Sequence, residues 1–173
     1  GSEMCIRDSA RHDTGYVDLL ARAVKVNAGV WAKEEVSVVA GRNRISADGK
    51  SVAPLSDNGS AKPQLAIDMG QMGGMYSGSI RMIGTEAGVG VRNQNAQVQA
   101  GKTLTVSSEG RLSWQSDAQN AATQAGGDIR MAARGAVDYQ GKLHGGGRLS
   151  VQSREGKLTQ SGTCLLYTSP SPR

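Results

Sequence analysis

The chain lacks several features that most globular domains have. It contains no phenylalanine, only two tryptophans and four tyrosines among 173 residues, so an aromatic-rich core is not available to it. No run of residues approaches the ~18 apolar positions of a transmembrane helix, and we therefore expect no membrane span. The first residues lack the apolar segment of a signal peptide. The net charge is +5, but the basic residues are scattered, which argues against a nucleic-acid partner.

Cysteine is confined to the two extremes of the chain, at Cys5 and Cys164. Residues 1–9 and 164–173, which hold these cysteines, both resemble translated sequencing adapter read in opposite senses. Such segments are set aside in fold reasoning, and the alternative is a native terminal disulfide or a tail rich in proline and serine. We expect the protein itself to occupy residues 10–163 and to contain no cysteine, which suits a chain that crosses an oxidising compartment unfolded.

A repeat runs through the second half of the chain. Residues 78–82, 102–106, 127–131 and 147–151 each carry two apolar side chains two positions apart, the pattern of a half-buried strand. Their first apolar positions are 24, 25 and 20 residues apart, and each segment is followed by a glycine. The residues predicted to form stacked internal ladders are Ile80, Met82, Leu104, Val106, Ile129, Met131, Leu149 and Val151.

A period of this length with short strands predicts an all-β fold, a parallel β-helix. One unit cannot bury its apolar face alone, whereas stacked units can, with strands ~4.8 Å apart along the stack. Leucine-rich repeats, β-propeller blades and helical solenoids require sequence patterns that the chain does not show. About seven coils are expected on this spacing.

The first half of the chain fits the same scheme less regularly. Residues 23–32, 36–40 and 65–69 alternate like strands, whereas residues 16–22 are compatible with one or two helical turns. Residues 48–64, rich in turn-forming pairs and holding two prolines, predict an extruded loop or hairpin. Trp31 and Trp114 are expected to cap a coil or pack against a loop, and the cluster of Met69, Met72, Met75 and Met82 to pack beneath the extruded loop.

No catalytic, cofactor-binding or metal-binding residues are predicted, and we expect no enzyme. His12 and His144 each lack a second ligand at metal-binding spacing. Asp68, Glu86 and Asp128 lie close to predicted strands, and a shared cleft for them would favour a β-helical polysaccharide lyase or hydrolase. The positive net charge leaves a binding module for anionic glycans as a further alternative.

Motifs in the first half resemble those of one known family. Residues 19–28, 31–33, 41–43, 67–68, 73–76 and 84–93 follow one another as in two-partner-secretion exoproteins. This group includes the filamentous haemagglutinins and the contact-dependent growth-inhibition toxins. The residues that carry the resemblance are Arg22, Asn27, Trp31, Gly73, Gly74, Met75, Tyr76, Thr85, Glu86, Gly88, Gly90, Arg92 and Asn93.

The resemblance implies a right-handed parallel β-helix that acts as the scaffold of a large secreted or cell-surface protein, an adhesin or the stalk of a contact-dependent toxin. Residues 10–95 would be the C-terminal part of a secretion-type domain, and residues 96–163 haemagglutinin-type repeats. The implied partners are an outer-membrane two-partner-secretion pore and, through regions outside this segment, a host or bacterial cell-surface receptor. No cofactor is implied.

Overall fold

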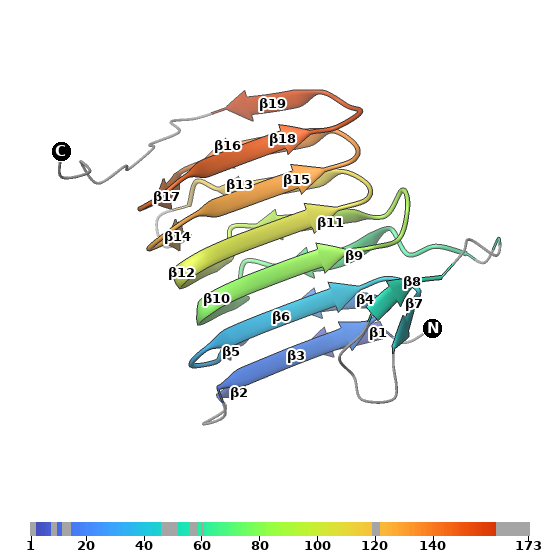
Figure 1. The fold of residues 1–173 in the computed structure, drawn as a ribbon, viewed down its shortest axis with the longest axis horizontal. Helices are drawn as coiled ribbons and strands as arrows, with labels where there is room; N and C mark the ends of the chain where they lie inside the picture. The colour runs from blue at the N-terminus through green and yellow to red at the C-terminus, as the bar shows by residue number, and fades with distance from the viewer. Residues whose placement is uncertain are drawn as a thin grey trace.

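The computed structural model describes residues 3–7, 10–11, 15–45, 52–55, 59, 61–118 and 122–161. These residues form strands and turns with no helix, so no helix in the described part is long and apolar enough to cross a membrane. The strands are parallel except for one hairpin, and they stack into a β-solenoid of about six turns. Figure 1 shows the stack, with the chain rising from β1 to β19.

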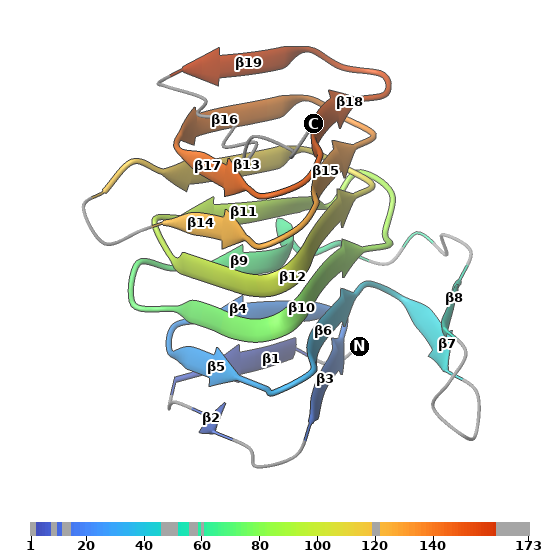
Figure 2. The ribbon, with the colours of Figure 1, turned by 60° about the vertical axis from the view of Figure 1, so that its left-hand side comes forward.

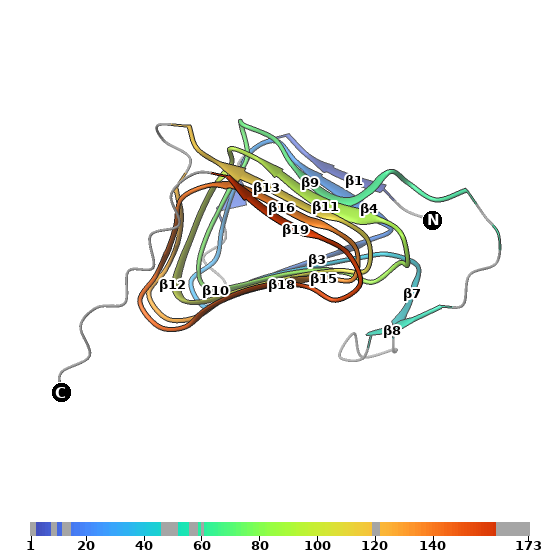
Figure 3. The same cartoon turned by 90° about the horizontal axis from the view of Figure 1, so that it is seen from above.

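Three faces enclose the interior, so that the solenoid looks triangular from above (Figure 3). The short face is built from β2 (Ala10–Arg11), β5 (Gly29–Trp31), the first part of β10 (Gly74–Gly84), the first part of β12 (Gln97–Ser108), β14 (Thr123–Ala125) and β17 (Leu143–Gly145). The long face is built from β3 (Tyr16–Ala21), β6 (Glu35–Ala40), the later parts of β10 and β12, β15 (Ile129–Ala133) and β18 (Leu149–Ser153). The return face is built from β1 (Glu3–Ile6), β4 (Ala23–Val26), β9 (Leu65–Met69), β11 (Gly90–Gln94), β13 (Leu112–Ser116), β16 (Val137–Gly141) and β19 (Leu158–Ser161).

We number the coils by their long-face strands, from coil 1 (β3) through β6, β10, β12 and β15 to coil 6 (β18). Seen from above, the chain passes the short face, then the long face, then the return face, turning anticlockwise as it rises toward the viewer (Figure 3). The solenoid is therefore right-handed. β10 and β12 bend between the short and long faces, and the register shift between Ser77 and Ser79 marks the bend.

The interior is filled by ladders of aliphatic side chains. On the long face Ile80 pairs in register with Leu104, Leu104 with Ile129, and Ile129 with Leu149. The second ladder, two positions later, is Met82, Val106, Met131 and Val151. Side chains in the middle coils are fully buried, whereas Leu149 and Val151 of the last long-face strand are half-buried. Each rung packs on the rung below, so burial depends on every coil being in register.

Glycine recurs where coils approach most closely. Gly126 lies over Gly101 at the bend between the short and long faces, and a Cβ at Gly126 would overlap the carbonyl oxygen of Gly101. A Cβ at Gly101 would meet nothing nearer than 3.7 Å. The close backbone contact therefore requires glycine at position 126, whereas position 101 has room for a Cβ atom.

We expect Gly126→Ala to lower the free energy of unfolding by about 1–3 kcal/mol, because backbone overlap must be relieved by separating two coils. Gly101→Ala is the matched control, and it should be neutral or slightly stabilising because alanine restricts the unfolded chain. Denaturant-unfolding midpoints of the two variants test the difference. Equal midpoints would show that the coils are not packed this closely.

An antiparallel hairpin leaves the solenoid between coils 2 and 3. β7 (Asn43–Ile45) pairs with β8 (Val52–Pro54), and the chain returns to the return face at β9. Figures 2 and 3 show the hairpin projecting from the corner between the long and return faces. We call this corner the hairpin corner. The excursion begins earlier than the predicted residue 48, and because it removes chain from the stack, six turns form instead of seven.

Three further expectations are corrected. Residues 16–22 are not helical: Val17, Leu19 and Ala21 of β3 face β6 in register, so period two prevails. Trp114 neither caps a coil nor packs on a loop, because it is 1% exposed inside the solenoid, where its Nε1 donates to Thr123 Oγ1 over 2.9 Å. Met69, Met75 and Met82 are core residues of the coils, whereas Met72 is exposed.

The structure describes part of the N-terminal segment but none of residues 164–173. Glu3–Ile6, from the segment that resembles adapter, forms β1 and pairs in register with β4, leaving Cys5 exposed and unpaired. Cys164 and the rest of 164–173 lie outside the described residues, as does His12.

Candidate functional site

The hairpin corner is the place where motif residues from distant parts of the sequence meet. Arg22 follows β3 in coil 1, and Glu86 follows β10 in coil 3. The guanidinium donates from Nη2 to Glu86 Oε1 over 2.8 Å and from Nε to Oε2 over 3.3 Å. The two side chains are only 15% and 9% exposed. A bidentate pair of this kind combines charge with fixed geometry.

This ion pair spans a gap in the corner. The chain of coil 2 leaves the solenoid after Ala40, so it supplies no turn between those of coils 1 and 3. Gly41, with φ of 145°, makes the exit, and a Cβ there would overlap Thr85 Oγ1. The Arg22–Glu86 pair therefore closes the space that the excursion opens.

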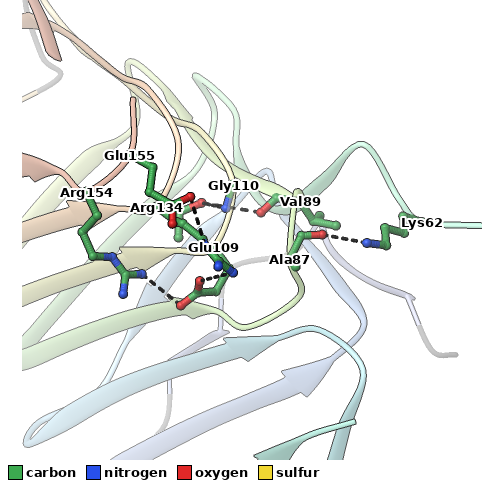
Figure 4. Close-up of polar contacts among 9 residues, drawn as sticks. Lys62, Ala87, Val89, Glu109, Gly110, Arg134, Arg154 and Glu155 are labelled. Atoms are coloured by element: carbon green, nitrogen blue, oxygen red, sulfur yellow. Dashed lines mark hydrogen bonds and ion pairs between the residues drawn. The ribbon is translucent and has the colours of Figure 1, made fainter. Parts of the chain in front are cut away.

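Two more contacts hold the ends of the excursion. At its exit, Thr85 Oγ1 donates to Asn43 Oδ1 over 2.6 Å. At its return, Lys62 Nζ donates to the carbonyl oxygen of Ala87 over 2.9 Å, as Figure 4 shows. Both partners belong to the turn that follows β10. We call Arg22, Asn43, Lys62 and residues 85–87 the hairpin clasp, because together they fix where the hairpin leaves and rejoins the solenoid.

A second group of motif residues lies on the return face. Arg92 donates to both carboxylate oxygens of Asp68 over 3.0 and 2.9 Å. This hydrogen bond raises the pKa of Arg92 above its ordinary value, with burial opposing the shift and charge attraction adding to it. The adjacent Asn93 is fully buried, and its side chain both donates to and accepts from the backbone of Ala96, which closes the turn between β11 and β12.

A third group lies on the short face. The rings of Trp31 and Tyr76 stack with centroids 4.9 Å apart and planes 12° apart. Each ring covers the glycine two residues before it, Gly29 or Gly74, where a Cβ would clash with the ring. Gly73 passes close to the backbone of β4. The two rings shield glycine backbone that has no side chain of its own to cover it, a role known for aromatic side chains on sheets.

The remaining motif positions have separate structural surroundings. Met75 is buried in the interior, and a Cβ at Gly70 would overlap the amide oxygen of Asn27. Gly88 has φ of 80°, and a Cβ at Gly90 would approach the Arg111 carbonyl oxygen to 2.9 Å. The motif residues therefore form three groups on different sides of the solenoid and do not converge on one cleft.

The three acids considered for catalysis are also apart. Asp68 pairs with Arg92 on the return face, Glu86 pairs with Arg22 at the hairpin corner, and Asp128 accepts the backbone N–H of Arg148 over 2.8 Å before β15. Within the described residues no three His, Cys, Asp or Glu side chains gather as a metal site would require. His144 lies on β17 of the short face, whereas Asp68 lies on the return face and Glu86 at the hairpin corner.

Sequence reasoning missed the clasp as a unit. It selected Arg22, Thr85 and Glu86 through the family resemblance, but gave no partner for any of them. Asn43 lay within the resemblance, in residues 41–43, but was given no role, and Lys62 was not selected. The available signal for Lys62 was positional, because it lies near the end of the predicted excursion, which must rejoin the stack next to the coil that follows.

Known proteins match the chain over two adjoining regions. The TPS secretion domain family matches residues 6–114, and the haemagglutinin repeat family matches residues 115–162. A tRNA nuclease CdiA of Escherichia coli (strain NC101) is 38% identical over 156 residues, covering 90% of this chain and 4% of that protein. A Toxin CdiA of Yersinia pestis is 40% identical over 97 residues, covering 56% of this chain and 3% of that protein.

A solved structure agrees with the fold. The crystal structure of a filamentous hemagglutinin secretion domain is 27% identical, with a TM-score of 0.52, over 86% of this chain and 47% of that one. This chain spans only 3–4% of the length of the curated relatives named above. The secretion-domain match covers more than half of the chain, and it indicates a secreted or cell-surface protein. The chain belongs to the TPS secretion domain family of two-partner-secreted exoproteins, in which it is a β-helical scaffold segment that continues into haemagglutinin repeats.

Proposed function

We propose that this segment is recognised by an outer-membrane transporter and, once outside the cell, starts the β-helix on which the rest of the exoprotein stacks. The observation that carries the proposal is the unbroken register across residue 114, where the two family matches meet. Leu112–Ser116 of β13 pairs residue by residue with β16, as β11 pairs with β13 before it. Each coil presents a complete edge on which the next can form.

Folding outside the cell would then favour outward transport, since a folded coil cannot slide back through a pore. We expect a triple variant, Ile80→Asp, Leu104→Asp and Ile129→Asp, to reduce the amount of full-length exoprotein on the cell surface at least about tenfold, because three charges would enter the core ladder. Export is measured with the exoprotein and its transporter expressed together.

The control changes the neighbouring outward positions instead. Arg81, Thr105 and Arg130 form one column on the exposed side of the same strands. Arg81→Asp, Thr105→Arg and Arg130→Asp together place charges of alternating sign in that exposed column and should leave export unchanged. Equal surface amounts of the core variant and the control would refute the proposed link between folding and export.

We further infer that residues 10–95 and 96–163 are the secretion-type and repeat parts of one scaffold, that residues 1–9 and 164–173 derive from adapter, and that the described coils carry no catalysis. The separation of Asp68, Glu86 and Asp128 supports the last point against a lyase or hydrolase. Several arginines are paired within the chain, which lowers the support for a glycan-binding module. Whether the whole exoprotein is an adhesin or a toxin carrier depends on regions beyond these coils, as does its receptor.

A further inference from the structure

The hairpin corner continues upward as a column of charged residues. Glu109 follows β12 in coil 4, Arg134 follows β15 in coil 5, and Arg154 and Glu155 follow β18 in coil 6. Figure 4 shows these four side chains turned toward one another along the corner. The turns themselves are tightly stacked, because Gly135 N–H donates to the carbonyl oxygen of Gly110 over 2.8 Å.

Two of the contacts in this column join neighbouring coils. Arg134 reaches down to Glu109, with Nη1 3.9 Å from Oε2, and up to Glu155, with Nε 3.3 Å from Oε2. Contacts of this kind add to the interface that any two stacked coils already share. With contacts of this kind alone, each coil interacts only with the coils directly above and below it, and coils can separate one at a time from an end of the stack.

The third contact is different because it omits a coil. Arg154 Nη2 lies 3.0 Å from Glu109 Oε1, although coil 5 stands between them. The Arg22–Glu86 pair does the same lower down, joining coil 1 to coil 3 past coil 2. Both arginines lie in outer coils, and both carboxylates lie in the two central coils.

We infer that these two pairs are second-neighbour ties, which join coil 1 to coil 3 and coil 6 to coil 4 past the coil between them. In a stack with nearest-neighbour contacts alone, coil 6 can separate from coil 5 without disturbing coil 4. With the tie, opening coil 6 also breaks a contact made by coil 4. The Arg154–Glu109 contact also forms late if coils are added in order, since Glu109 of coil 4 can bind Arg154 only after coil 6 has folded. This inference rests on the geometry of the corner and holds whether or not a transporter recognises the chain.

Hydrogen exchange resolved by peptide tests the tie between coils 4 and 6. In the whole chain, Arg154→Met should speed exchange of the β18 and β19 amides by about two- to fivefold, the range expected for an exposed ion pair. Glu109→Gln, made two coils away, removes the carboxylate charge that both Arg154 and Arg134 contact, so it should also speed exchange of the same amides. Once Arg154→Met has removed the tie, adding Glu109→Gln should accelerate exchange less than it does in the wild type, because the Arg154–Glu109 contact can be lost only once.

Two controls separate a tie from general loosening. Arg130→Met, on the exposed long face of coil 5, removes a guanidinium away from the corner and should leave β18 and β19 unchanged. High salt should accelerate exchange more in the wild type than in Arg154→Met, because salt screens the Arg154–Glu109 contact only where it exists, whereas the Arg134–Glu155 contact is present in both. If Glu109→Gln leaves β18 exchange at the wild-type rate, or if the two substitutions add, the inference is wrong.

Discussion

Replacing Leu104 with aspartate is expected to unfold the solenoid. Leu104 is fully buried in coil 4, with Ile80 below it and Ile129 above it in the same ladder. A carboxyl group at this position would have only aliphatic neighbours along the ladder, and burying it without a partner costs several kcal/mol even when it is protonated. Because the ladder is continuous, the loss would reach both adjoining interfaces.

We expect the loss to exceed about 5 kcal/mol, which is comparable to the whole stability of an ordinary domain. Circular dichroism of Leu104→Asp should show loss of the strand signal and of a cooperative unfolding transition. Thr105→Asp is the matched control, since Thr105 pairs outward with Arg81 and Arg130 and a carboxylate there would have favourable neighbours. That control should change stability by less than about 0.5 kcal/mol. A cooperative Leu104→Asp with near wild-type stability would place Leu104 outside the core.

The ladders could be predicted from sequence because their signal is local and repeated. Apolar residues two apart followed by glycine define a strand and a corner, and the recurrence of that pattern leaves stacking as the way to bury it. The structure adds the exact partners, such as Ile129 with Leu149. Nothing in such a pattern requires knowledge of distant residues.

The predictions that were wrong concern segments whose local sequence pattern was ambiguous. The adjacent Leu19 and Leu20 left residues 16–22 compatible with one or two helical turns, yet on strand β3 Leu19 packs against the core and Leu20 lies on the other side of the strand. Trp114 was expected to cap a coil or to pack against a loop. Instead its indole N–H donates to the buried hydroxyl of Thr123 on the short face, and nothing in the local sequence pattern indicated this partner nine positions later.

The hairpin clasp could not be predicted as geometry. Arg22 and Glu86 are 64 residues apart, and their meeting depends on the excursion that removes one corner between them. Sequence reasoning found the excursion but placed its start at residue 48, where the turn-forming pairs begin, whereas the chain leaves the solenoid after Ala40. Because the Arg22–Glu86 pair forms across the turn that coil 2 does not supply, it can be predicted only when the order in which the coils stack is known.

Breaking the Arg22–Glu86 pair is expected to have the second-largest effect. Its carboxylate is 9% exposed, so removal of the guanidinium would leave a nearly buried charge without its main partner. Losses of about 3–5 kcal/mol are typical when one member of a buried pair is removed. We therefore expect Arg22→Met, which keeps the aliphatic stem, to lower the unfolding free energy by that amount. Glu86→Gln should cost less, because the amide still accepts a hydrogen bond from Arg22.

The double variant Arg22→Met with Glu86→Met distinguishes a tie from simple packing. Replacing both charges by apolar groups of similar size removes the desolvation cost as well as the attraction, so its loss should be smaller than the sum of the single losses by about 2 kcal/mol or more. Glu155→Gln, at an ion pair whose carboxylate is 65% exposed, is the control and should cost no more than about 1 kcal/mol. The cycle compares the wild type, Arg22→Met, Glu86→Met and the double variant by chemical denaturation. If the Arg22 and Glu86 losses simply add, the two side chains do not act as a pair, and the corner left open by the hairpin must be held by Thr85 and its neighbours.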